Sequence, residues 1–175
     1  DSPSILAESG ANLGTVARQA ALHNLTGLEW ASTIPGSLGG AVYGNAGAHG
    51  GDMSKSLVLA NILHRQKGEL SLSGEQMAYG SRSSALKRDP GSAAILSAQQ
   101  KVTKGDAASI KAQMDENSAK RRNSQPPGAS MGSMFKNPQG DYAGRLIESA
   151  GLKGASIGGV QVSPVHANFM VNNGS

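Results

Sequence analysis

The placement of glycine is the feature that most constrains what this sequence can fold into. The chain has 24 glycines among 175 residues, nearly twice the ~7% that is typical of proteins. They cluster at 36–51 and 151–159, between segments with clear helical or strand periodicity, and they follow no collagen-like repeat. These clusters therefore predict tight backbone turns inside a folded protein rather than disorder.

The rest of the composition excludes several classes of protein. The absence of cysteine excludes disulfides, thiolate zinc sites and cysteine nucleophiles, and it is compatible with a reducing compartment. The four histidines do not have the spacing of metal ligands, so no metal site is predicted. The net charge of +4 is too small and too scattered to indicate nucleic acid binding. No apolar run approaches the roughly 20 residues that span a bilayer, so no membrane insertion is expected.

The first part of the chain has the patterns of both helices and strands. Asn12 is expected to cap a helix that runs to about Leu25 and stops before Gly27. Ser73 and Gln76 have the spacing of a capping box, which predicts the start of a short helix. Strands are expected at 57–64, 69–72 and 93–102.

The composition changes near Gly105-Asp106, where we expect a domain boundary. Asp106 begins a predicted helix that ends in the basic cluster 120–122, which we interpret as a solvated helix end. Two prolines in 125–128 forbid helix and predict an extended linker, after which Met134-Phe135 begins a new ordered segment. Asp141 is expected to cap another helix, with Ala143, Leu146, Ile147 and Ala150 facing inward. Two closing strands are expected, near 157–162 and 167–171.

The glycine-rich segment 34–48 has the residue types of a phosphate-binding loop. Its glycines remove Cβ atoms where backbone approaches another group, and consecutive N–H groups in such turns form concave anion sites. Ser37 and Asn45 add a hydroxyl and an amide. The spacing is not that of the dinucleotide-binding fingerprint, and a glycine-rich turn between packed elements is an equal alternative.

Three further segments contain polar side chains that could bind or react. Arg82 can present its guanidinium to a carboxylate or phosphate, although a surface arginine in a loop is the default interpretation. Ser133 could donate a proton or act as a nucleophile, but no nucleophile elbow surrounds it, and a turn serine is the default. For His166 and Asn168, structural hydrogen bonding is the favoured interpretation.

Each of these segments is a weak signal by itself, but their order along the chain is informative. Gly-Leu-Glu at 27–29 precedes the Ile-Pro-Gly…Gly-Gly-Ala…Asn-Ala-Gly-Ala stretch, then Arg-x-Ser, Gln-Pro-Pro and Gly-Ser-Met-Phe-Lys-Asn-Pro. Ala-Gly-Arg-Leu-Ile-Glu-x-Ala-Gly-Leu-Lys-Gly and Val-Ser-x-x-His-Ala-Asn-Phe follow. Over essentially the whole chain, this series resembles the UDP-N-acetylenolpyruvoylglucosamine reductase (MurB) family.

The resemblance implies an α+β fold with two domains. Residues 1–105 would be part of an FAD-binding domain of the vanillyl-alcohol-oxidase-like (PCMH) type. Residues 106–175 would be part of the MurB substrate domain. The implied activity is the reduction of the UDP-sugar UDP-N-acetylenolpyruvoylglucosamine to UDP-N-acetylmuramate by NADPH, through FAD, in cytoplasmic synthesis of peptidoglycan precursors.

The resemblance also implies roles for particular residues. Arg82 matches the arginine that stabilises charge developing toward the substrate carboxylate, and Ser133 matches the family's proton donor. The flavin-contacting segment of the family matches Ile34, Pro35, Gly36, Ser37, Gly39, Gly40, Asn45, Ala46 and Gly47. Contacts with the substrate are expected from Lys136, Asn137, Arg145 and Glu148.

The sequence departs from the family pattern in three places. Ser81 stands where the family usually has tyrosine, and the upstream flavin-binding turn and the C-terminal catalytic glutamate are both absent. Glu148 lies in another block and is no substitute for that glutamate, so truncation at both ends is expected. A non-catalytic flavin- or nucleotide-binding fragment is therefore the alternative hypothesis. A different flavin oxidase is disfavoured by the Gly-Ser-Met-Phe-Lys-Asn-Pro block.

Overall fold

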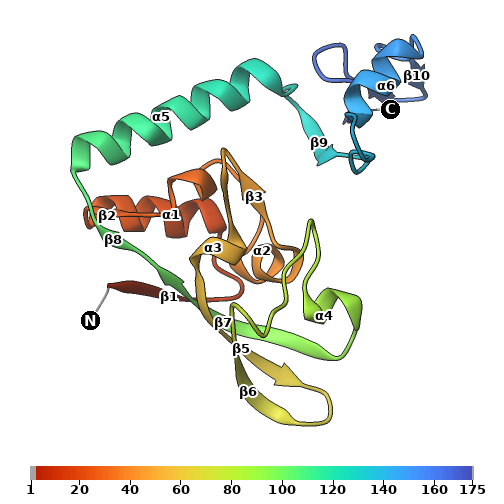
Figure 1. Ribbon diagram of the computed structural model, residues 1–175. Coiled ribbons are helices and arrows are strands. Elements are labelled where there is room, and N and C mark those ends of the chain that lie inside the picture. Colours follow the sequence, from red (N-terminus) through yellow and green to blue (C-terminus); the bar gives the residue numbers. More distant parts are fainter. Residues whose placement is uncertain (1–2, 175) are drawn as a thin grey trace. The chain divides into compact units, whose positions relative to one another are not determined.

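The computed structural model describes residues 3–174, and the chain forms two compact units, Asp1–Ser118 and Ala119–Ser175 (Figure 1). Helix α5, Ala107–Ser124, contains the point where they divide. The boundary predicted at 105/106 lies just before this helix, so the first turns of α5 belong to the first unit.

The first unit is built on a four-stranded antiparallel sheet in the order β1-β7-β5-β6. The three predicted strands are confirmed, whereas β1 was not predicted. A tight turn joins β5 to β6, and Gly68, with φ of +72°, pairs with His64 there. The strands are β1 (Ser4–Glu8), β5 (Leu57–His64), β6 (Gly68–Ser73) and β7 (Ala93–Lys101).

Helix α1, Leu13–Leu22, begins as predicted but ends earlier. The Asn12 side chain accepts a hydrogen bond from the N–H of Thr15 at 3.0 Å, which caps the helix. The predicted end at Leu25 is wrong, because Asn24 has φ of +56° and turns the chain out of the helix. Strand β2, Leu25–Thr26, follows and pairs with β8, Thr103–Lys104.

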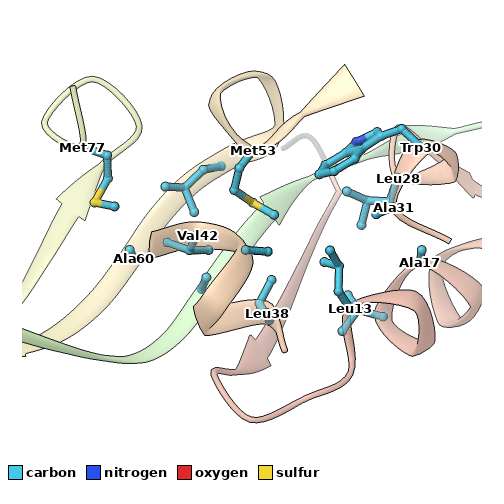
Figure 2. Packing of buried hydrophobic residues seen from close by; sticks show 14 of the residues in the cluster. Leu13, Ala17, Leu28, Trp30, Ala31, Leu38, Val42, Met53, Ala60 and Met77 are labelled. Carbon is cyan, nitrogen blue, oxygen red and sulfur yellow. The ribbon is translucent and has the colours of Figure 1, made fainter. Parts of the chain in front are cut away.

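Helix α2, Leu38–Gly44, lies against strand β7 and beside α1 (Figure 1). Its buried side chains join those of α1, β5 and the 3-10 helix η1, Glu29–Ala31, in one apolar core (Figure 2). Because this core contains few aromatic rings, alanine, leucine and valine fill most of it. The shorter elements nearby are β3 (Gly47–Ala48), β4 (Gly51–Asp52), α3 (Met53–Ser56) and α4 (Ala85–Arg88).

The capping box predicted at Ser73 forms its hydrogen bonds without starting a helix. The N–H of Ser73 donates to the Gln76 side chain at 2.8 Å, and the N–H of Gln76 donates to Ser73 Oγ at 3.2 Å. The predicted short helix is wrong, because the segment forms turns that end at Ala78, whose φ is +44°.

Helix α5 has one apolar anchor and one polar anchor in the first unit. Asp106 caps it by accepting from the N–H of Ser109 at 2.8 Å, as predicted. Ile110 is buried, and the buried Asn117 amide donates to the carbonyl of Glu29 at 3.2 Å. The last turns of the helix carry the basic cluster 120–122.

The second unit has a four-stranded antiparallel sheet in the order β10-β11-β12-β9 and one short helix, α6 (Ala143–Ser149). The ordered segment was predicted to begin at Met134. It begins earlier, at Ala129, with strand β9. The strand predicted over 157–162 is a hairpin, because Gly158, with φ of +54°, reverses the chain within it. The strands are β9 (Ala129–Ser133), β10 (Ser156–Ile157), β11 (Val160–Val162) and β12 (Phe169–Asn172).

Helix α6 packs through its first turn. Ala143 is buried and Ile147 is half-buried, but Leu146 and Ala150 are exposed, so the predicted inward face is partly wrong. The reason is that Gly144 lies against His166 and Asn168. The helix face that contains Ala143 and Gly144 therefore points inward, and Leu146 points toward solvent. The N-cap position is Tyr142 rather than Asp141.

Residues 3–174 contain neither a membrane-spanning helix nor a cluster of metal-binding side chains. Between residues 3 and 174, no helix is both long and apolar enough to cross a membrane. Over the same residues, no group of three or more histidine, aspartate or glutamate side chains could hold a metal ion.

Candidate functional site

The glycine-rich segment forms a tight turn whose backbone donors are largely used inside the protein. The N–H groups of Leu38 and Gly39 donate to the carbonyls of Ala11 and Ser9, both at 2.8 Å. The N–H of Gly40 donates to Ser37 Oγ at 3.2 Å, so Ser37 is an N-cap of α2. Of the consecutive N–H groups expected in this segment, those of 38–40 are therefore not free, because the turn before α1 and the Ser37 cap accept their hydrogen bonds.

The glycine at position 39 is explained by close packing. A Cβ atom there would lie 2.8 Å from the Cβ of Ser9 and 3.2 Å from its carbonyl oxygen, which is closer than van der Waals contact allows. The segment was interpreted either as a phosphate-binding loop or as a packed glycine-rich turn, and at Gly39 the packed turn is sufficient to explain the glycine.

The turn at 35–37 combines a positive φ angle with unpaired backbone N–H groups, and close packing explains neither. Gly36 has φ of +109° and is exposed, with open space where a Cβ would lie. Within the part of the chain that the structure describes, the N–H groups of Gly36 and Ser37 donate to no protein acceptor. Two adjacent donors on an exposed turn that lacks side-chain bulk fit a phosphate oxygen.

Asn45 connects this segment to the loop that carries Arg82. Its amide nitrogen donates to the carbonyl of Gly80 at 3.0 Å, and its amide oxygen accepts from the N–H of Ser54 at 3.1 Å. Arg82 Nη1 in turn donates to the backbone carbonyl of Asn45 at 3.5 Å. The predicted catalytic arginine and the predicted flavin-contacting segment therefore lie side by side in the first unit.

Arg82 occupies an uncommon backbone conformation. It lies in the turn Gly80–Ser83, closed by hydrogen bonds of 3.0 and 3.2 Å between the backbones of the end residues, and its φ is +53°. Residues other than glycine and asparagine rarely adopt this left-handed backbone conformation. Backbone strain of this kind is frequent at functional sites. Arg82 is an exposed residue, so an anionic group can approach it.

Tyr79 has a structural role close to this turn. Its hydroxyl donates to the carbonyl of Val42 at 2.9 Å, and burial, with a smaller contribution from the charge of Asp52, raises the pKa of Tyr79. It therefore stays protonated and fixes the loop against α2. Ser81, which stands where the family usually has tyrosine, is exposed.

The second unit contains a pocket of about 330 Å³. It brings together four of the predicted catalytic and substrate-binding residues, namely Ser133, Asn137, Arg145 and Glu148. The other two are Lys136, which does not line it, and Arg82, which lies in the first unit. The remaining lining residues are Tyr142, Gly144, Lys153, Val165, His166, Ala167 and Asn168. Tyr142 and Lys153 were missed, although both lie in or beside the Ala-Gly-Arg…Leu-Lys-Gly block.

The charged side chains of the pocket are paired. Arg145 donates to Asp141 from Nε at 2.7 Å and also from Nη2. This contact, together with a hydrogen bond from the N–H of Tyr142, lowers the pKa of the Asp141 carboxyl to about 2. Lys153 Nζ lies 2.7 Å from a carboxylate oxygen of Glu148. The pocket wall thus offers two positive charges, each held in place by a carboxylate.

Buried amides position the wall of this pocket. Asn168 is 3% exposed, and its side chain accepts from the N–H of Phe135 at 2.9 Å and donates to the Phe135 carbonyl at 2.8 Å. The amide oxygen of Asn137 accepts from the N–H of Ala143 at 3.1 Å, at the start of α6. The prediction of structural hydrogen bonding by Asn168 is confirmed, and Asn137 also has such a bond.

A second hollow, of about 280 Å³, lies in the first unit. Trp30 and Val102 form its apolar part, and the exposed side chains of Lys55 and Lys101 stand at its edge. None of the predicted site residues lines it.

Two family models match this chain. One, described as the UDP-N-acetylenolpyruvoylglucosamine reductase C-terminal domain, matches residues 123–175, and one described as an FAD binding domain matches residues 1–70. Their order is the one that the sequence predicted, and the predicted fold class is confirmed.

Curated relatives and a solved structure carry the same family name. The chain is 41% identical over 170 residues to the UDP-N-acetylenolpyruvoylglucosamine reductase of Chloroflexus aurantiacus, covering 95% of this chain and 57% of the relative. It is 47% identical over 151 residues to that of Halalkalibacterium halodurans, covering 86% and 50%. The crystal structure of the Thermus caldophilus reductase (MurB) superposes with a TM-score of 0.89 at 34% identity, covering 98% of this chain and 62% of that one.

The chain thus spans about 57% of the length of the first of these relatives. The matches extend over both units and include the glycine-rich segment, the Arg82 loop and the pocket of the second unit. On this evidence the chain belongs to the UDP-N-acetylenolpyruvoylglucosamine reductase (MurB) family.

Proposed function

We propose that this chain is part of an enzyme that reduces UDP-N-acetylenolpyruvoylglucosamine to UDP-N-acetylmuramate with electrons from NADPH, through FAD. The observation that carries the proposal is the pocket of the second unit. It contains Ser133, which the family resemblance assigns as the proton donor, and Asn137, Arg145 and Glu148, which the resemblance assigns to substrate binding. A concave, polar site with two cations suits an anionic sugar nucleotide.

The first unit has residues that fit FAD. The free N–H groups of Gly36 and Ser37 would hold a phosphate oxygen of the flavin cofactor, and the open space at Gly36 leaves room for it. The contacts expected from Ile34, Pro35, Gly39, Gly40, Ala46 and Gly47 belong to the same proposal. When bound, FAD supplies the hydride for the enolpyruvyl double bond after its own reduction by NADPH.

Arg82 would stabilise charge that develops on the substrate. Hydride addition to the terminal carbon sends negative charge toward the substrate carboxylate, and a fixed cation there lowers the energy of the transition state. The hydrogen bond from Nη1 to the Asn45 carbonyl, at 3.5 Å, and the left-handed backbone of its turn direct Arg82 toward the flavin-contacting segment.

Ser133 would donate the proton that completes the reduction. A serine hydroxyl is a weak acid, so it needs an acceptor as basic as an enolate or a neighbouring cation. Arg145 and Lys153 line the same pocket and are candidates for that cation. Lys136 lies outside the pocket wall, and we propose that it contacts a more distant part of the substrate.

The first test is whether the purified chain retains FAD. Flavin absorbance and fluorescence are measured after incubation with FAD and removal of the free dye, and NADPH oxidation is then followed with and without the enolpyruvyl substrate. Retained flavin with substrate-dependent oxidation supports the proposal. Retained flavin without turnover instead supports a non-catalytic flavin-binding fragment. A folded chain without flavin contradicts that alternative and means that flavin binding requires the longer protein.

The role of each residue is tested in a form of the protein that has the full length of its relatives. Arg82→Ala and Ser133→Ala should each lower the rate of sugar reduction by about a hundredfold or more. The rate of flavin reduction by NADPH should change much less, because that step needs no enolpyruvyl protonation. Equal losses in the two half-reactions would show that the assigned roles are wrong.

A further inference from the structure

Most polar groups that line the pocket of the second unit already have protein partners. Arg145 is paired with Asp141, Lys153 with Glu148, and the amides of Asn137 and Asn168 with backbone groups. Across the described residues, four polar side-chain groups of the pocket make no hydrogen bond within the protein. They are the hydroxyls of Ser133 and Tyr142, the amide nitrogen of Asn137 and the Nε2 atom of His166.

His166 has the largest number of contacts that fix its side chain among these four residues. Its Nδ1 atom accepts a hydrogen bond from the N–H of Asn168 at 3.2 Å. The neutral ring therefore carries its proton on Nε2. The ring meets that of Phe169 edge-on, with centroids 4.8 Å apart at 61°. Because position 144 is glycine, α6 can approach closely, and a Cβ there would lie 3.2 Å from His166 Cε1.

These contacts fix both the tautomer and the orientation of the ring. A donor that is held in this way needs no side-chain ordering when a ligand binds, which makes its hydrogen bond more favourable than that of a mobile serine or lysine. Arg145 and Lys153 stand on the same wall, each paired with a carboxylate, and an N–H donor beside these ion pairs can bind an oxyanion of the ligand.

We propose that the Nε2–H of His166 donates a hydrogen bond to an oxyanion of the bound substrate and so acts as a binding residue of this pocket. This inference rests on the proposed function, because it takes the ligand to be a UDP-sugar. The oxyanion belongs either to the diphosphate or to the enolpyruvyl carboxylate, and both have the chemistry that an N–H donor recognises.

Two substitutions separate this role from a structural one. In His166→Asn the amide oxygen replaces Nδ1 as the acceptor for the N–H of Asn168, but the donor at Nε2 is lost. In His166→Gln the amide nitrogen lies near the former Nε2 position and can still donate to the ligand. His64→Asn is the matched control, because His64 Nδ1 also accepts backbone N–H groups, those of Gln66 and Lys67 at 3.1 and 3.3 Å, in the other unit.

Binding of UDP-N-acetylenolpyruvoylglucosamine and of UDP-N-acetylglucosamine is measured by calorimetry on the whole chain, with melting temperatures recorded for each variant. We expect His166→Asn to bind about tenfold more weakly, which is the effect of one lost hydrogen bond to a charged group. His166→Gln should stay within about threefold of the original chain, and His64→Asn should bind equally well. Weaker binding of both ligands identifies the diphosphate as the acceptor, and weaker binding of the enolpyruvyl ligand alone identifies the carboxylate.

Two results would overturn the inference. One is unchanged affinity in His166→Asn. The other is an equal loss of affinity in the asparagine and glutamine variants together with lower melting temperatures, which would make the histidine purely structural. If the unmodified chain binds neither UDP-sugar, the proposed function of the pocket fails first, and this inference fails with it.

Discussion

A single buried amide, that of Asn168, holds the backbone around Phe135 in place. Alanine at this position would leave both the N–H and the carbonyl of Phe135 without their side-chain partner. We expect Asn168→Ala to lower the free energy of unfolding of the second unit by about 2–3 kcal/mol. Urea denaturation measures this loss. Asn173→Ala is the control, because Asn173 is exposed, with a long hydrogen bond of 3.4 Å to Gln161, and should change stability by less than about 0.5 kcal/mol.

The pKa of Asp141 reports whether Arg145 stays paired in solution. Hydrogen bonds from Arg145 and from the N–H of Tyr142 lower this pKa from an ordinary 3.8 to about 2. Because the folded-state value is the lower one, the carboxylate stabilises the fold above about pH 4, and this contribution disappears as the pH falls toward 2. In carbon-13 NMR titrations, Arg145→Ala should raise the Asp141 midpoint toward 3.8. Lys153→Ala should not, because Lys153 pairs with Glu148.

At the scale of elements, two adjacent glycines in helix α2 should respond oppositely to substitution. A Cβ at Gly39 would overlap Ser9, whereas at Gly40 its nearest neighbour is Ser37 Oγ at 3.4 Å, an ordinary contact. We expect Gly39→Ala to destabilise the first unit by about 1–3 kcal/mol. Gly40→Ala should be neutral or stabilise it by up to about 1 kcal/mol, because alanine favours helix. Chemical denaturation without FAD measures both, and a similar loss at the two positions would contradict this account of α2.

Elements with strong local signals could be predicted from the sequence. The apolar runs of β5 and β7 and the caps at Asn12 and Asp106 each depend on neighbouring residues, so the sequence alone reveals them. Strand β1 could not be predicted, because only its pairing with β7, more than 85 residues away, makes it a strand.

The pocket of the second unit could be predicted only in part. Ser133, Asn137, Arg145 and Glu148 were identified by family resemblance, since no local spacing indicates that a strand end, a loop and a helix face enclose one hollow. His166 belongs to the same hollow because Gly144 lets α6 approach its ring. That is a packing contact between residues 22 positions apart, and it has no signature in the local sequence.

At the scale of the whole molecule, the two compact units and the two family models suggest separate ligand-binding roles. The flavin-domain model ends at residue 70 and the C-terminal-domain model begins at residue 123. Residues 71–122, with the Arg82 loop and most of α5, therefore lie outside both family models, although the whole-length relatives match them. Contacts within the first unit tie that loop to α2 through Asn45.

This division of roles predicts where each ligand will slow hydrogen–deuterium exchange. Saturating FAD should protect amides in 34–48 and in the Arg82 loop, because a ligand stabilises the segments it binds by about 2.7 kcal/mol at a hundred times its dissociation constant. UDP-N-acetylglucosamine should instead protect 133–148 and 163–168, which enclose the pocket. Exchange followed by mass spectrometry resolves these peptides, and strand β6, which pairs with β5 and carries no predicted site residue, serves as an internal reference. Protection of the second unit by FAD alone would mean that the assignment of flavin to the first unit is wrong.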